Sequence, residues 1–353
     1  MPLKYRRPVD WAVRPRTKPW GSRLLLLSLV AVLVLMLPRE GHAATPAATP
    51  PTKVLVDIYV VNVGSIDQQK GSSPVDFYLS FAWNGSWYGP GGNSSSPALP
   101  QDFALMDGTV NQLQLISSQG DINGTGENYL SFRVGATLFD QMNFVRFPLD
   151  SQRLSIQIES NDFTNASLVY VPDTESQIGQ NVSIPGWIVD GGSGLSVENQ
   201  LYRTSFGYPG LPPAYAAYYS EAIFTINIHR PVQTAALTLV VPLVVLVALA
   251  TISFRIRMDS FGPRLQLGVV SIFTAVAFLL NMNNSVPVQG YFTLGDDTLL
   301  VAFGVLIYSI CVTVVLHYYD PSSPPGWAKA LNRSSFVGVP LAAVLLTLLI
   351  VAL

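Results

Sequence analysis

After Arg230 the sequence turns into four long apolar segments, and these constrain the fold more than any other feature. In a bilayer only helices and closed barrels satisfy their own backbone, and a helix needs about 20 apolar residues to span the hydrocarbon core. Residues 231–353 are therefore predicted to form a transmembrane domain. Its expected helices are 232–254, 265–286, 298–317 and 335–353.

The loops between these segments predict how the helices are oriented. The first loop carries three arginines and the third carries Lys329 and Arg333, whereas the second carries two acids and no base. Short cytoplasmic loops are enriched in Lys and Arg, so the first and third loops are expected in the cytoplasm. The N-terminal part of the chain and the C-terminus should then lie on the extracellular or periplasmic side.

Residues 1–43 have the pattern of a secretory signal peptide. Seven basic residues precede an apolar run of about 14 residues, which is too short to span a bilayer as a helix. Gly41 and Ala43 are small residues at the positions that a signal peptidase reads. We expect cleavage near Ala43. An uncleaved anchor is the alternative, because the basic stretch before the apolar run is long.

Residues 44–230 read as an extracellular or periplasmic β domain. Short alternating or β-branched runs such as KVLVDIYVVNV are separated by Gly, Pro, Asn, Asp and Ser, without helical periodicity. We expect an immunoglobulin-like sandwich of about ten strands. This region has seven Lys or Arg against 16 acids, and the single cysteine of the chain, Cys311, excludes an intrachain disulfide.

One short motif makes this order of domains recognisable. The sequence FPLDSQ at 147–152 resembles the aromatic-Pro-x-Asp-x-Gln core of the Cys-loop in pentameric ligand-gated ion channels. The flanking cysteines of that loop would fall at Asp140 and Leu154, and their absence resembles the bacterial members. Arg230 matches the basic residue that precedes the first helix in this family.

The resemblance extends over residues 52–353. Pro242 matches a proline within the first helix, and residues 260–287 resemble the pore-lining second helix with Pro287 at its end. It implies a homopentamer around a central pore in the plasma membrane, which is the inner membrane of a bacterium. The implied partners are four identical subunits, a small-molecule agonist, inorganic ions and membrane lipid, and the resemblance implies no cofactor.

One stripe on the second helix is the candidate pore surface. Its positions recur at spacings of four and three, so they share a face that is polar at both ends and apolar in the middle. Such a face suits a channel that closes by dewetting, with the gate at Phe273 and Val270, although a plain packing surface has the same periodicity. The stripe consists of Gln266, Val270, Phe273, Ala277, Leu280 and Asn284.

Two indications on the permeant ion conflict. Gly262 and Pro263 stand where cation-selective members of the family place a glutamate, and a proline there resembles the anion-selective branch. The acidic β domain, by contrast, would concentrate cations over the pore. We expect a slight preference for cations.

The resemblance places an agonist between subunits, beneath the hairpin at 203–221. Aromatic rings and a carboxylate would attract an organic cation such as an amine by cation–π and charge interactions. Alternatively, these side chains only cover strand ends, and a proton acting on the many acids, or on His229, is a rival agonist. The candidate ligand-binding residues are Glu159, Asn161, Phe163, Phe206, Tyr208, Tyr219 and Tyr78.

The family geometry also predicts a coupling junction at the membrane surface. There the loop around 147–150 and the first hairpin should meet the loop between the second and third helices. Asp150 and Arg230 are expected to form an ion pair. The candidate gating residues are Phe147, Pro148, Asp150, Arg230 and Pro287.

Other classes of function have little support in the sequence. It contains no catalytic Ser/His/Asp spacing, no HExxH motif and no phosphate-binding glycine loop, so an enzyme is not expected. The low content of charged residues, 12%, also argues against a nucleic-acid partner. The competing interpretation is a membrane-anchored periplasmic sensor or binding protein that does not conduct ions.

Overall fold

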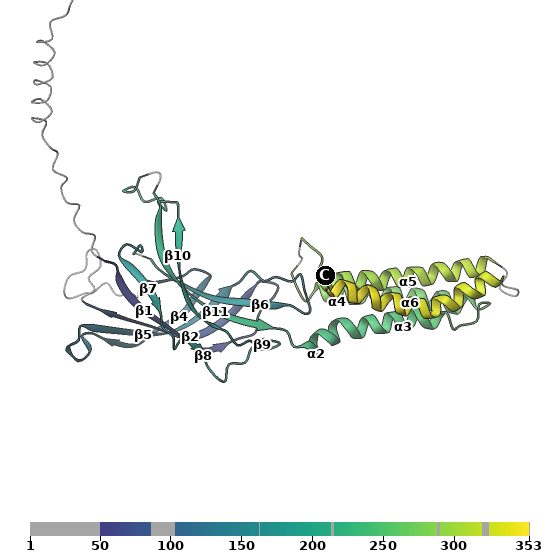
Figure 1. Cartoon of the computed structure of the whole chain (residues 1–353), viewed down its shortest axis with the longest axis horizontal. Helices are drawn as coiled ribbons and strands as arrows, with labels where there is room; N and C mark the ends of the chain where they lie inside the picture. Colours follow the sequence, from purple (N-terminus) through teal and green to yellow (C-terminus); the bar gives the residue numbers. More distant parts are fainter. Residues whose placement is uncertain are drawn as a thin grey trace, which may run out of the picture. The chain divides into compact units, whose positions relative to one another are not determined.

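The computed structural model describes residues 50–85, 103–161, 163–212, 215–287, 290–319 and 325–352. The expected signal peptide, 1–43, lies outside these residues. Apart from one short 3-10 turn, η1 (Ile122–Gly124), the elements up to His229 are strands, and helices follow from Val232 (Figure 1). A β sandwich followed by four membrane-length helices was predicted from the sequence, and this fold is confirmed.

Six strands form the first sheet: β1 (Thr52–Val63), β2 (Ser72–Asn84), β4 (Gly108–Gln119), β5 (Glu127–Phe139), β7 (Leu168–Pro172) and β8 (Gln177–Ile178). Their order is β4-β5-β2-β1-β7, and β8 also pairs with β1. Along β1 every second side chain is buried, including Val54, Val56 and Ile58. A slip of one residue would turn these side chains to solvent, so the buried face fixes the register.

The second sheet has five strands: β3 (Phe103–Leu105), β6 (Ser151–Ser160), β9 (Ile188–Val189), β10 (Gly194–Tyr202) and β11 (Ala217–His229). Their order is β10-β11-β6-β3, and β9 pairs with the end of β11. Phe224, Ile226 and Ile228 of β11 are fully buried, and the residues between them point to the other face. That outer face carries the candidate ligand site.

The inner faces of the two sheets share one apolar core. Phe77 and Phe81 from β2 and Phe224 from β11 are 0% exposed. Truncating such a buried phenylalanine to alanine costs about 3–5 kcal/mol of stability. The core thus holds the strands rigidly, which leaves the outer faces and the loops free to carry function.

The helical part begins with α2 (Val232–Ala235), the π-helical turn η2 (Ala236–Val240) and α3 (Val241–Ser253). These together form one span, and α4 (Phe261–Asn283), α5 (Leu294–Tyr318) and α6 (Gly326–Ala352) form three more. All four spans are long and apolar enough to cross a membrane, and they run side by side in Figure 1. The chain is therefore a multi-pass membrane protein.

Three helices begin earlier than the apolar segments suggested: α4 at Phe261, α5 at Leu294 and α6 at Gly326. The start of α5 shows the reason. Thr293 Oγ1 accepts a hydrogen bond from the Asp296 amide at 3.2 Å, and Asp296 Oδ2 accepts one from the Thr293 amide at 2.9 Å. This capping box starts the helix in polar sequence, ahead of the part that hydropathy detects.

Candidate functional site

An acid and several aromatic rings meet on the outer face of the five-stranded sheet. Glu159 on β6 forms a side-chain hydrogen bond with Tyr202 at the end of β10. The Tyr202 ring lies 5.6 Å from the Tyr219 ring of β11 and 5.5 Å from the Phe206 ring, measured between centroids. These four side chains form what we call the acid–aromatic cluster.

The strand register explains why the cluster forms. Glu221 on β11 lies directly opposite Glu159 on β6, and Gln200 on β10 lies opposite Tyr219 on β11. Alternate residues of a strand share a face, so Tyr202, Tyr219, Glu221 and Glu159 all point outward. The pairing of three strands thus brings together residues that are far apart in the sequence.

The Glu159 carboxyl is poised to titrate near neutral pH. Its pKa is raised to about 7, chiefly by burial and to a smaller extent by the nearby Glu221 carboxylate, while the Tyr202 hydrogen bond opposes the rise. The residue is 6% exposed, and among the described residues its Oε2 atom has no hydrogen-bond partner. A buried acceptor without a donor is costly, so a cationic ligand that donates to Oε2 would be stabilised there.

The cluster contains three of the seven candidate ligand-binding residues: Glu159, Phe206 and Tyr219. Asn161 and Tyr208 are exposed outside it, with Tyr208 66% exposed in the hairpin. Tyr78 lies on β2 in the other sheet, where the Arg133 guanidinium carbon stands 5.9 Å from its ring centroid. Phe163 is only 7% exposed and packs into the sandwich core, because the chain turns inward after β6.

Sequence reasoning missed two members of this region, Tyr202 and Glu221. Period-2 alternation along β10 and β11 could have placed both on the outer face. The strand pairing that puts them beside Glu159, however, is not encoded in either strand alone.

The predicted ion pair between Asp150 and Arg230 is present. Arg230 Nε donates to Asp150 Oδ1 at 2.5 Å, and the two side chains are 8% and 1% exposed. Gln68, in the turn between β1 and β2, accepts from an Arg230 Nη2 at 2.7 Å, and Gln152 donates to Asp150 Oδ2 at 2.6 Å. Both charges are thus buried and hydrogen-bonded, which is the condition under which a buried pair persists.

Three loops join the β domain to the helices around this pair. The amides of Leu294 and Gly295, which begin α5, donate to the carbonyls of Val145 and Phe147 at 2.8 and 2.9 Å. In the β1–β2 turn, the Gln69 side chain donates to the carbonyls at 284 and 286, just after α4. The expected contact of the 147–150 loop and the first hairpin with the α4–α5 loop is therefore present.

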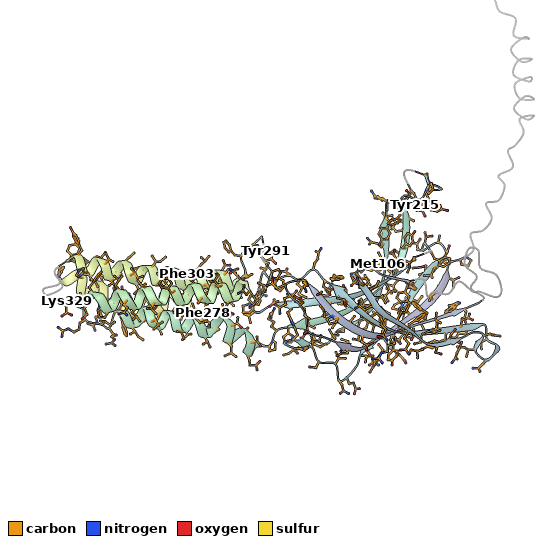
Figure 2. All side chains as sticks on the ribbon, turned by 180° about the vertical axis from the view of Figure 1, so that it is seen from behind. Met106, Tyr215, Phe278, Tyr291, Phe303 and Lys329 are labelled. Carbon is orange, nitrogen blue, oxygen red and sulfur yellow. The ribbon has the colours of Figure 1, made fainter. Side chains whose placement is uncertain are left out.

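Aromatic side chains from the loop after β5 extend this junction into the helices. Phe144 and Phe147 are 1% and 3% exposed and pack in one cluster with Met282 of α4 and Leu299 of α5. The Phe144 amide donates to the Tyr291 hydroxyl at 3.1 Å, and Figure 2 labels Tyr291 in the loop between α4 and α5. A displacement of this loop would therefore directly displace the ends of α4 and α5, against which it packs.

Asp140 fastens the start of the same loop. Its Oδ1 accepts hydrogen bonds from the amide and the hydroxyl of Ser155 at 2.9 and 3.1 Å, beside Leu154. These bonds join Asp140, one of the two positions that resemble the missing cysteines, to Ser155, the residue that follows the other. Burial raises the pKa of Asp140 to about 6, with a smaller contribution from Asp107, and its Oδ2 atom has no partner within the described part of the chain.

Asp140→Asn should stabilise the protein at neutral pH. A carboxyl whose folded-state pKa is raised from 3.8 to about 6 destabilises the fold progressively as pH rises between these values, and fully above about 6. Asparagine keeps the acceptor for Ser155 without the buried charge. The melting temperature of the full chain in detergent should rise above pH 6 by roughly 2–4 °C for each kcal/mol recovered, and should match the wild type near pH 4.

Glu127→Gln is the control for this prediction, because Glu127 is an exposed acid on β5. It should leave the melting curve unchanged at both pH values. An Asp140→Asn protein that melts lower than the wild type at neutral pH would show that the ionised carboxylate stabilises the fold.

The six residues of the candidate pore stripe are all exposed in the chain. Phe273 is 70% exposed, Val270 52% and Leu280 58%. The opposite side of α4 is buried against the other helices, and a Cβ on Gly268 would lie 2.6 Å from Ile310 of α5. The helix thus packs closely on one face and presents the stripe on another.

Arg264, near the start of α4, is turned into the helix bundle. The residue is 2% exposed, and its guanidinium donates to the carbonyls of Phe254 and Ile256 and to the Asn332 side chain. It therefore points away from the stripe. Asp259, the acid before it, is paired with Arg257 at 2.9 Å.

The described residues contain no group of three His, Cys, Asp or Glu side chains that could hold a metal ion.

No family model matches the chain. It is 23% identical over 196 residues to the γ-aminobutyric acid receptor subunit rho-2 of Homo sapiens. The aligned residues make up 55% of this chain and 40% of that protein. It is 24% identical over 217 residues to the pH-sensitive chloride channel 2 of Drosophila melanogaster, covering 59% and 40% respectively. The aligned part thus spans about two fifths of these relatives.

Proposed function

We propose that the chain belongs to the Cys-loop superfamily of pentameric ligand-gated ion channels and that it assembles as a homopentamer that conducts ions when an agonist binds. One helical bundle cannot enclose an aqueous path and also pack its own core, so a pore requires several subunits around an axis. The agonist would bind between adjacent β domains, and α4 would line the pore.

The observation that carries this proposal is the exposed stripe on α4. Its apolar middle at Phe273, Val270 and Leu280 is exposed although the opposite face of the same helix is buried. Gln266 and Asn284 place polar groups at its two ends. Around a symmetry axis, five such stripes form a pore with polar mouths and an apolar constriction at Phe273, which closes by excluding water.

The acid–aromatic cluster supports an organic cation, such as a primary amine, as the agonist. Tyr202, Tyr219 and Phe206 supply aromatic faces, and Glu159 supplies a carboxylate with an unpartnered oxygen. An ammonium group is attracted by both features. Tyr78, on the other sheet, would complete the site from the neighbouring subunit.

Amine activation should depend on pH through Glu159. With a pKa of about 7, this carboxyl is neutral below and ionised above that value, and only the ionised form attracts an ammonium group. The half-maximal amine concentration should therefore rise by up to about tenfold for each pH unit below 7. Dose–response curves measured across this range check the prediction.

Two variants separate Glu159 from other acids. Glu159→Gln should give a weak response that varies little with pH. Glu221→Gln removes a repelling charge, so the pH dependence should shift to more acidic values. A pH profile that is identical in wild type and Glu159→Gln would contradict this role. Current on acidification without amine would identify the proton as an agonist.

The most specific part of the proposal is the charge of the permeant ion. We propose a slight preference for cations. The acidic β domain supports it by raising the local concentration of cations. At the cytoplasmic end of α4, Asp259 contributes little net charge because it is paired with Arg257. Reversal potentials in diluted NaCl test the preference, and a shift toward the chloride potential would overturn it.

The decisive experiment is two-electrode recording from oocytes that express the full chain. The external solution is first acidified and then supplemented with small primary amines such as propylamine. We expect a current that is reversible and absent from uninjected cells. If the chain reaches the surface but stays silent, and Phe273→Ser also fails to open a current, the channel proposal fails in favour of a non-conducting sensor.

A further inference from the structure

Two carboxyl groups, from Asp107 in the turn between β3 and β4 and from Asp140 directly after β5, meet the hydroxyl of Ser155 on β6. Ser155 Oγ is 3.0 Å from Asp107 Oδ2 and 3.1 Å from Asp140 Oδ1. The Ser155 amide also donates to Asp140 Oδ1 at 2.9 Å. Likewise, the Gln157 amide donates to Asp107 Oδ1 at 3.1 Å. Because β3 pairs with β6 only from Ile158 onward, the two carboxyls bind β6 amides that this short strand does not reach.

The single proton of the Ser155 hydroxyl decides what these contacts mean. A hydroxyl donates one hydrogen bond and accepts two. Ser155 Oγ accepts one from Gln157 Nε2 at 3.1 Å, which leaves one proton and one lone pair for the two carboxyls. If the hydroxyl donates to Asp140, it must accept from Asp107, and only a protonated carboxyl donates. All three contacts of the hydroxyl are therefore hydrogen bonds only when one of the two carboxyls carries a proton.

No cation neutralises the two carboxyls within the described part of the chain, where neither of them forms an ion pair. The charged groups on the surrounding elements are Arg153 and Glu159 on β6, Glu221 on β11, Arg146 in the loop before β6, and Asp67 and Lys70 in the β1–β2 turn. Of these, Lys70 is paired within its turn and both arginines are exposed. Burial raises the pKa of both carboxyls, and the charge of Asp107 adds to the rise at Asp140. Since two like charges at one partly buried site repel each other, protons leave the pair as a unit and not one residue independently of the other.

The pair lies where three connections of the β domain meet. The Asp140 amide donates to the carbonyl of Gly71, at the end of the β1–β2 turn, at 2.9 Å. A Cβ on Gly71 would lie 2.8 Å from the Asp140 carbonyl oxygen, so the two backbones are in close contact. The Phe139 amide donates to the carbonyl of Asp107 at 2.6 Å. Asp140 begins the loop 140–150 that contacts the first residues of α5, so its side chain holds the start of that loop against β6.

We propose that Asp107 and Asp140 share one proton through Ser155, and that this proton is a pH-sensitive latch that fastens the start of the 140–150 loop to β6. While the pair holds the proton, every polar contact of the hydroxyl is satisfied. When the proton leaves, two carboxylates compete for one hydroxyl proton and repel each other, and the loop is released. The pair titrates at about pH 6, so the latch is closed in mild acid and open at neutral and alkaline pH.

Hydrogen exchange of the full chain in detergent tests the latch. Exchange of the 140–150 amides is followed by mass spectrometry at about pH 5 and about pH 8, and each rate is divided by the intrinsic rate at that pH. In the wild type this ratio should rise by at least about tenfold between the two pH values. In Asp107→Asn, the asparagine amide takes the place of the protonated Oδ2 and donates to Ser155 Oγ, so the ratio should change by less than about twofold.

Asp76→Asn is the matched control for the exchange measurement, because Asp76 is an acid of the same β domain that is paired with Arg133 and lies outside the latch. It should keep the wild-type dependence on pH. If the wild-type ratio is the same at both pH values, or if Asp107→Asn retains the wild-type dependence, the latch does not exist.

A double-mutant cycle tests whether the proton is shared. At about pH 8, Asp107→Asn and Asp140→Asn each remove the same repulsion. The melting temperature of the double variant should therefore rise by less than the sum of the two single rises. Rises that add fully would show that the two carboxyls titrate independently, and they would overturn the proposal.

The effect of the latch on gating rests on the proposed channel function. With saturating propylamine, the maximal current of the wild type should fall by at least about twofold from about pH 6 to about pH 8, and that of Asp107→Asn should not. Saturation removes the effect of Glu159 on amine affinity. An unchanged wild-type maximum would overturn the role of the latch in coupling. A silent channel would defeat the proposed function, and the exchange and cycle measurements on the purified chain would still decide the latch.

Discussion

Asp150→Asn should raise the half-maximal agonist concentration by more than about 100-fold. Asparagine has almost the same shape, but it removes the only carboxylate that contacts Arg230 among the described residues. Arg230 is then left charged and buried, and breaking such a pair costs about 3–5 kcal/mol. Because a tenfold change corresponds to about 1.4 kcal/mol, an effect of this size on the open state would nearly abolish the response.

A second-site change should rescue this variant. Gln68 Oε1 already accepts from Arg230 Nη2 at 2.7 Å, so Gln68→Glu places a carboxylate next to the guanidinium without altering the length of the side chain. In the Asp150→Asn background, Gln68→Glu should lower the half-maximal agonist concentration at least tenfold. In the wild type, Gln68→Glu adds a second anion beside Asp150. There it should raise the half-maximal agonist concentration, by less than it lowers that concentration in the Asp150→Asn background.

Asp76→Asn is the matched control for Asp150→Asn. Asp76 and Arg133 also form an ion pair, at 2.5 Å, but on the half-exposed outer face of the six-stranded sheet. Exposed pairs contribute about 0–1 kcal/mol, so the agonist response should stay within a few-fold of wild type. If Asp150→Asn reaches the surface normally and responds like Asp76→Asn, the buried pair has no part in coupling.

Phe273→Ser should produce a standing current without agonist. The closed pore would be held by an apolar ring of five phenylalanine side chains from which water is excluded. A hydroxyl at this position lets water enter. Since closed and open states of a protein commonly differ by only a few kcal/mol, wetting the constriction is expected to make the open state a major population. The current should reverse at the same potential as the agonist current.

Ile307→Ser controls for the presence of a new hydroxyl in the membrane. Ile307 lies on α5, outside the stripe, and is 54% exposed, close to the 70% of Phe273. It should leave the resting current at the level of the wild type. Equal leak from both variants would indicate general damage to the bundle, and no leak from Phe273→Ser at normal surface density would remove Phe273 from the gate.

Several features of this protein were readable in the sequence because they depend on local pattern. The alternation along β1 and the apolar length of the four spans predicted the sandwich and the helices. The pairing of Asp150 with Arg230 was also expected, because the family resemblance places both residues at the membrane surface. That the six stripe residues of α4 share one side follows from helical spacing alone, since a fixed period assigns each side chain to a side of the helix.

Other features were decided only by the tertiary structure. Whether Glu159 stands beside Tyr202 and Glu221 depends on the register of three strands, and Phe163 lies in the core because of how the chain turns after β6. The meeting of Asp107 and Asp140 at Ser155 joins three separate segments. A period fixes which way a side chain faces, but its neighbours, its burial and therefore the pKa of Glu159 are set by the elements that pack against it.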